Sequence, residues 1–259
     1  MGAHMALKGT YVYGVIAADR PPRLARVPAG LPGAGPARLL DLEKGLFIAV
    51  ADLPLDKYNE SAVSSGLADL DWVSRVAVAH EAVVESFVAA KAVLPMKLFT
   101  IFKSDERALD HMRSQRTRIA ALVKRVANQQ EWGIRLVLDR TRAAAAPKTR
   151  GAAARTGASY LAQKKAQRDA AKELASGARD TAAAVFERLA ARASDAKRRS
   201  ASELPAQGGP LLLDAAFLVP RARASSFKML AARESKALAR NGYGLALSGP
   251  WPPYTFVQG

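Results

Sequence analysis

The chain has 259 residues and a formal net charge of +16 at pH 7, from 39 Lys and Arg against 23 Asp and Glu. Hydrophobic residues make up 49% of the sequence, which is enough for a folded core and excludes a wholly disordered chain. Cysteine is absent, which excludes disulfides, thiolate nucleophiles and cysteine-ligated metal sites.

The sequence carries no targeting or membrane-spanning signal. Residues 1–5 (MGAHM) are typical of an expression-tag remnant, so the fold is expected to begin after them. No apolar run approaches the ~20 residues that a spanning helix needs. We therefore expect a cytoplasmic protein that does not enter a membrane.

The first half of the chain mixes strand and helix patterns. Residues 10–18 (TYVYGVIAA) are rich in aromatic and β-branched side chains, as strands are. Gly45 stands between two apolar runs and predicts the tight turn of a hairpin. Asp69 and Ser104 are each followed by apolar residues at three- and four-residue spacing, which indicates two capped helices. We expect strands at 10–18, 37–42, 46–53 and 92–102, and helices at 69–91 and 104–126.

The second half places the same mixture around a long alanine-rich stretch. Residues 141–158 contain no large apolar side chain and predict a flexible basic loop. Small residues then repeat at helical spacing as far as Arg199, with a break expected near Ser176 and Gly177. Leu174, Ala178, Ala182, Val185, Leu189 and Ala193 form the expected apolar seam. We expect strands at 132–140, 211–220 and 243–249, a helix at 227–240, and an extended Pro/aromatic tail at 249–257.

Strands and helices intermix in both halves without regular alternation, which predicts an α+β protein with two α+β domains. We place the N-terminal domain at 6–130 and the C-terminal domain at 131–259. The alternative boundary is Thr141, in which case the strand that begins at Trp132 closes the first sheet.

Motifs of catalysis are missing from the sequence. GLPGAG (30–35) lacks the Gly-Lys-Ser/Thr ending of a phosphate loop, and no G-x-S-x-G element occurs. His80 lies on or beside an apolar helix face, where it is either a general base or a ring packed at the margin of the core. We favour packing, because the sequence places no second titratable group with it. No catalytic, cofactor-binding or metal-ligating residue is therefore predicted, and the expected protein is not an enzyme.

The positive charge is concentrated between Arg142 and Arg199, where fourteen Lys and Arg stand against five acids. Clustered basic side chains favour binding to nucleic acid. They equally suit an acidic protein partner or a solvated helix face. Aromatic side chains that would stack on bases are nearly absent from this stretch. The candidate basic docking surface is Lys164, Lys165, Arg168, Lys172 and Arg179.

Several segments together resemble the gas vesicle proteins GvpF and GvpL. The resemblance covers nearly the whole chain and follows the order YVYGVI, VAHEAVVESF, VLPMKLFTIF, EWGIRLVLDR, TGASYLAQKKAQRD, LLLDAAFLVPR and GPWPPYTFV. The last of these matches the terminal G-P-W-P-P-Y-x-F of the family. One departure is that the family usually has Phe-Gly-Thr where this chain has Leu98-Phe99-Thr100.

The resemblance implies a modified ferredoxin-like fold for the second domain and a non-enzymatic role in making gas vesicles, which are hollow protein shells. It also implies that the chain is located with gas vesicles and that its partners are the very hydrophobic shell-forming protein GvpA and other gas vesicle accessory proteins. We expect such a protein partner rather than nucleic acid; a basic nucleic-acid-binding or general scaffold protein is the alternative.

The tail GPWPPYTFV (249–257) is both stiff and apolar. Prolines hold it extended, so docking costs it little conformational entropy. Its aromatic side chains either pack on the folded chain or anchor a partner, and we favour packing on the chain itself. The candidate residues for either role are Trp251, Pro252, Pro253, Tyr254 and Phe256.

Overall fold

The computed structural model describes residues 7–138, 157–199 and 209–257. They form an α+β protein of two units, each built around its own β-sheet. The first unit takes the chain up to Gln130 together with its end from Pro250, and the second takes Glu131–Gly249. Residues 1–5 and all but the last two residues of the expected loop at 141–158 lie outside the described residues.

The first unit contains an antiparallel sheet whose central strand is β1, Lys8–Ala17. All but the first residue of β1 are buried, which explains its aromatic and β-branched sequence. The strand order is β2-β3-β1-β4, and β5 pairs with a further stretch of β1. The other strands are β2 Arg38–Glu43, β3 Leu46–Pro54, β4 Ala92–Pro95 and β5 Ile101–Phe102.

Two glycines shape this sheet. Gly45 has a φ of 79° at the turn between β2 and β3, a conformation that favours glycine. At Gly14 the register between β1 and β3 shifts. A Cβ there would lie 2.8 Å from the carbonyl oxygen of Leu94, so a larger residue would push β1 away from β4.

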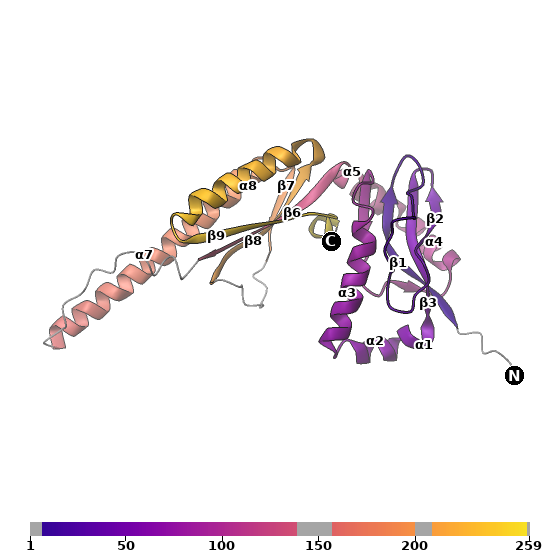
Figure 1. The fold of residues 1–259 in the computed structure, drawn as a ribbon, viewed down its shortest axis with the longest axis horizontal. Helices are drawn as coiled ribbons and strands as arrows, with labels where there is room; N and C mark the ends of the chain where they lie inside the picture. Colours follow the sequence, from indigo (N-terminus) through magenta and orange to yellow (C-terminus); the bar gives the residue numbers. More distant parts are fainter. Residues whose placement is uncertain (1–6, 139–156, 200–208, 258–259) are drawn as a thin grey trace. The chain divides into compact units, whose positions relative to one another are not determined.

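Helix α3 (Leu70–Glu85) covers one face of the first sheet, and α4 (Asp105–Ser114) and α5 (Arg116–Val126) cover the other (Figure 1). Asp69 caps α3 by accepting hydrogen bonds from two backbone N–H groups, as expected. The helix ends six residues before the expected Lys91. The expected helix at 104–126 is divided at Gln115, and two short helices, α1 (Leu55–Tyr58) and α2 (Glu60–Gly66), were not expected.

The second unit contains a four-stranded sheet in the order β7-β8-β6-β9. Helices α7 (Gly157–Ala190) and α8 (Ala224–Ala239) share its apolar core, which includes Phe217 and Phe227. The strands are β6 Gln129–Leu138, β7 Asp195–Arg198, β8 Leu211–Pro220 and β9 Tyr243–Trp251, with a 3-10 turn at Arg221–Arg223. The element order β-α-β-β-α-β is one that ferredoxin-like units have, and that detailed assignment stays a prediction.

Helix α7 differs from the expected alanine-rich helices in three ways. It runs without interruption through Gly177, where we expected a break. It ends at Ala190, because Asp195–Arg198 pairs with β8 as the edge strand β7 instead of continuing the helix to Arg199. Among the side chains of α7 that the structure describes, the buried seam begins at Ala178, and Leu174 is 56% exposed.

The end of the chain corrects two expectations. The tail is not extended throughout, because β9 continues to Trp251 and a helical turn, α9, follows at Tyr254–Val257. Nor does the tail belong to the second domain, as the boundary 131–259 implied. Residues from Pro250 onward group with the first unit, where the partly buried Tyr254 packs against the core and α9 contacts strand β4.

Candidate functional site

The candidate tail residues come together on the first unit. Pro252, Pro253 and Phe256 are buried, the last to 1% exposure, and Tyr254 packs against the core cluster that contains Tyr11 and Tyr13. Trp251, by contrast, is 38% exposed. The tail therefore divides into a buried part and an outward-facing tryptophan.

Local bonds shape the tail into a compact turn. The N–H of Tyr254 donates to the carbonyl of Pro252 at 2.7 Å, and that of Phe256 donates to the carbonyl of Pro253 at 3.1 Å. The guanidinium carbon of Arg125, on α5, lies 5.9 Å from the ring centroid of Phe256. A cation at this distance from an aromatic ring is attracted to it.

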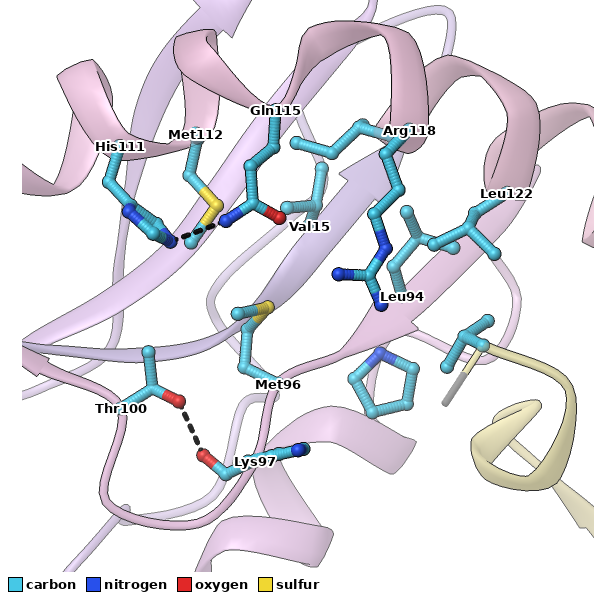
Figure 2. A pocket seen from close by; sticks show the side chains of 13 residues that line it. Val15, Leu94, Met96, Lys97, Thr100, His111, Met112, Gln115, Arg118 and Leu122 are labelled. Atoms are coloured by element: carbon cyan, nitrogen blue, oxygen red, sulfur yellow. Dashed lines mark hydrogen bonds between the residues drawn. The ribbon is translucent and has the colours of Figure 1, made fainter. Parts of the chain in front are cut away.

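An apolar groove lies beside the docked tail. It has a volume of about 400 Å³ and is bounded by β1, β4, the loop that follows β4, α4, α5 and α9. Leu94, Met112 and Ile119 form buried parts of its lining, and Val257 of α9 contributes to one wall. Figure 2 shows side chains from the helices facing Met96 and the loop across this space.

The charged side chains that line the groove are positive. Lys97 and Arg118 line it and are exposed, and no Asp or Glu is among the described residues that line it. Gln115 and His111 form a hydrogen bond of 2.7 Å along the helical side, and the hydroxyl of Thr100 donates to the carbonyl of Lys97 (Figure 2). The groove is thus an apolar surface with cationic and neutral polar groups around it.

Sequence reasoning did not identify this groove. Met112, Ile119 and Leu122 belong to the apolar helix stripe that the spacing predicts, but periodicity does not tell which of these side chains faces a core and which faces a recess. Met96 and Lys97 follow the end of β4, and nothing in their local pattern indicates a site. Only the meeting of β4, α5 and the chain end creates the hollow.

His80 is buried within the core of the first unit and is 3% exposed. Its Nδ1 lies 2.7 Å from the hydroxyl of Tyr11, and both Tyr11 and Tyr13 contact its ring. Burial lowers the pKa of His80 to about 4, an effect that the nearby backbone of Met96 partly opposes. Burial also raises the pKa of both tyrosines. His80 is therefore a neutral core residue near pH 7, without access for a substrate.

Neither a metal site nor a membrane span emerges from the ranges 7–138, 157–199 and 209–257. Within them, no group of three or more His, Cys, Asp or Glu side chains is arranged to hold a metal ion. No helix there combines the length and the apolar character needed to cross a bilayer.

The candidate basic residues all lie on α7 and are all exposed: Lys164, Lys165, Arg168, Lys172 and Arg179. At about 100° per residue they share one stripe of the helix, and Asp169, Glu173 and Asp180 share the neighbouring stripe. Phe186 is not an open stacking platform, because the guanidinium carbon of Arg198 lies 4.5 Å from its ring centroid and Phe217 packs on it. The basic docking surface belongs to the second unit, and the tail and the groove belong to the first.

The fold of the chain is shared with solved gas vesicle proteins. The crystal structure of GvpF from Anabaena sp. PCC7120 matches 97% of this chain with a TM-score of 0.68 at 16% identity, over 96% of its own length. GvpF from Microcystis aeruginosa matches 96% of the chain with a TM-score of 0.65 at 17% identity, over 99% of its own length. At these identities the likeness establishes the mixed helix-and-sheet fold.

The sequence establishes the family. Residues 9–258 match the gas vesicle synthesis proteins GvpL/GvpF. Over 242 residues the chain is 30% identical to gas vesicle protein L of Streptomyces sp. (strain CB03234), which covers 89% of this chain and 87% of that protein. It is 28% identical over 267 residues to gas vesicle protein F of the same strain, and this match covers 96% of this chain and 99% of that protein. The chain belongs to the GvpL/GvpF family of gas vesicle proteins.

Proposed function

We propose that this chain is a non-enzymatic accessory or structural protein that binds the hydrophobic shell-forming subunit GvpA and takes part in gas vesicle assembly. The observation that carries the proposal is the match to the GvpL/GvpF family, which spans residues 9–258. Other accessory proteins of the vesicle are further partners, and the chain acts in the cytoplasm at the vesicle or its precursors.

The first unit supports a binding role. Its groove of about 400 Å³ offers apolar side chains to a partner, and an apolar subunit needs such cover before it is built into a shell. The burial of His80 supports a role without catalysis, because its low pKa and closed surroundings do not suit a general base near pH 7.

The basic stripe of α7 favours one alternative, binding to nucleic acid. Electrostatic binding of that kind weakens steeply as salt increases, because it releases condensed counterions. Binding to an apolar subunit depends much less on salt. Salt dependence therefore separates the two functions.

The test is capture of each product of the same gene cluster by the purified chain, at low and at moderate salt, together with deletion of its gene. We expect capture of the shell-forming subunit at both salt concentrations and loss of vesicles in the deletion strain. Salt-sensitive binding to generic DNA without capture of the shell subunit would support the alternative. Normal vesicles in the deletion strain and no capture would refute the proposal.

A further inference from the structure

The groove beside the C-terminal turn is lined in a way that suits a particular kind of ligand. Leu94, Met112 and Ile119 provide a floor that is already packed and buried, and Met96 and Leu122 are half-buried around it. Met side chains adapt their shape to different apolar surfaces. A ligand that buries a few apolar side chains would therefore be accommodated without rebuilding the unit.

The charge around this floor is of one sign. Arg118 on α5 and Lys97 in the loop after β4 line the groove, and none of the described lining residues is acidic. Figure 2 shows Arg118 between Gln115 and Leu122, with its guanidinium directed toward the groove. A guanidinium has five N–H donors in a planar fork, so it can receive a carboxylate alongside another partner.

The size of the groove limits its occupant. A volume of about 400 Å³ holds a short segment with two or three apolar side chains and not a domain face. One wall is already the chain's own α9, since Val257 lines the groove and is 7% exposed. The recess that remains open is bounded by α4, α5 and the loop at Met96–Thr100.

We propose that this groove is the docking site for an apolar segment of the shell-forming subunit that carries a carboxylate, with its apolar side chains on the floor and its carboxylate at Arg118 and Lys97. The charge complementarity selects this occupant over an apolar segment without acids. The assignment of the partner rests on the proposed function; the location and the chemistry of the site rest on the groove itself.

Binding of fluorescent 15-residue peptides that cover the shell-forming subunit tests the site, with the full-length chain as receptor. Each peptide is compared with a copy in which Asp and Glu are replaced by Asn and Gln. The receptor variants are Arg118→Gln, the double variant Lys97→Gln/Arg118→Gln, and Leu122→Trp, which fills the groove. Lys124→Gln is the matched control: it removes one charge from the same helix, but Lys124 lines a different hollow, which Lys44 also lines.

We expect peptides from one region of the subunit to bind. Arg118→Gln should reduce their affinity about tenfold and the double variant should reduce it further. Leu122→Trp should abolish binding. Lys124→Gln should bind as wild type. The peptide in which Asn and Gln replace Asp and Glu should bind weakly to wild type. Arg118→Gln should weaken its binding little further, because the carboxylate that pairs with Arg118 is already absent. Unchanged thermal unfolding and near-ultraviolet circular dichroism of the variants show that folding is intact.

Capture of the whole subunit with equal affinity by wild type, the double variant and Leu122→Trp would overturn the groove as the site while the proposed function stands. Equal binding of acidic and amide peptides would overturn the role of charge. Failure of wild type to capture the subunit at all would overturn the proposed function and this partner with it. Binding of dodecanoate in the groove with no peptide bound would identify a small-molecule site and contradict the proposal.

Discussion

The ring of Phe99 stacks on that of Trp72, with centroids 5.5 Å apart and an angle of 5° between the planes. Phe99 has a φ of 63°, the left-handed conformation that favours glycine. This is the position at which the resemblance to the GvpF and GvpL proteins leads one to expect glycine. The stacking of an aromatic side chain thus accompanies a strained backbone in the loop that borders the groove.

Replacing Phe99 by Gly should therefore change stability little. The substitution relieves strain of roughly 1–3 kcal/mol but removes the stacking and the burial that the ring contributes. The informative measurement is a double-mutant cycle with Trp72→Ala, followed by urea unfolding. We expect a coupling energy of about 1 kcal/mol, so Trp72→Ala should cost less in the Phe99→Gly background. Strictly additive effects would show that the stacking contributes nothing.

Arg38 on β2 and Asp105 on α4 form a two-bond ion pair, with N–O distances of 2.6 and 2.8 Å. Asp105 also accepts from the hydroxyl of Thr10 at 2.7 Å. We expect Asp105→Asn to lower the free energy of unfolding by about 1–2 kcal/mol, since the pair is bidentate but partly exposed. Asp110→Asn on the same helix, whose partner Arg113 is exposed, is the control and should cost less than about 0.5 kcal/mol.

The ion pair between Arg38 and Asp105 also makes the free energy of unfolding depend on pH. Hydrogen bonds from Arg38 lower the pKa of Asp105 in the folded chain. Its stabilisation is therefore complete above the pKa of an unfolded Asp, about 3.9, and is lost as the pH falls through the lower folded pKa. Urea unfolding between pH 5 and pH 2 should show a shallower loss for Asp105→Asn than for wild type. Parallel curves would contradict this linkage.

Because of His80, the free energy of unfolding should fall as the pH is lowered from 6.5 to 4. Its pKa is about 4 when folded and near 6.5 when unfolded, so the unfolded chain binds more protons in this window. The stabilisation is complete above pH 6.5, and roughly 3 kcal/mol of it is lost by pH 4. His80→Gln should remove this slope, while His111→Gln on the surface should keep it. Nuclear magnetic resonance titration of the His80 ring would measure the folded pKa directly.

The tail should stabilise the first unit. Truncation after Gly249 removes the buried side chains of Phe256 and Val257, and Phe256→Ala alone should cost about 3 kcal/mol. Trp251→Ala should cost less than about 1 kcal/mol, because that side chain is 38% exposed. Hydrogen exchange resolved by segment is the measurement, with faster exchange expected in β4. A truncated chain of full stability that no longer binds its partner would instead make the tail an anchor.

Gly177 offers a test of helix α7. No atom lies within 4 Å of the position that a Cβ would take, so Gly177→Ala should stabilise the helix by about 0.5–1 kcal/mol. Gly14→Ala is the opposite case and should destabilise the chain, because its Cβ would meet the Leu94 carbonyl oxygen at 2.8 Å. Thermal unfolding followed by circular dichroism compares the two. Loss of stability in Gly177→Ala would point to a break in the helix there.

The sequence by itself determined the helix cap at Asp69, the turn at Gly45 and the family. Asp69 caps its helix and Gly45 makes its turn because caps and turns depend on the dihedral preferences of a few neighbouring residues. Segments in a characteristic order, ending in GPWPPYTFV, were enough to indicate the GvpF and GvpL family, which the match over residues 9–258 confirms. The burial of His80 also followed from its place on an apolar helix face.

Contacts between distant residues were decided only by the tertiary structure. The alanine-rich stretch ends its helix at Ala190 because Asp195–Arg198 finds a partner in β8, which local propensity does not reveal. The tail docks on the first unit, although it follows the last strand of the second unit in the chain. The groove likewise exists only where β4, α5 and Val257 meet. The periodicity of the sequence indicates which face of a helix or strand is apolar, but the packing of the whole chain decides which of these faces meet.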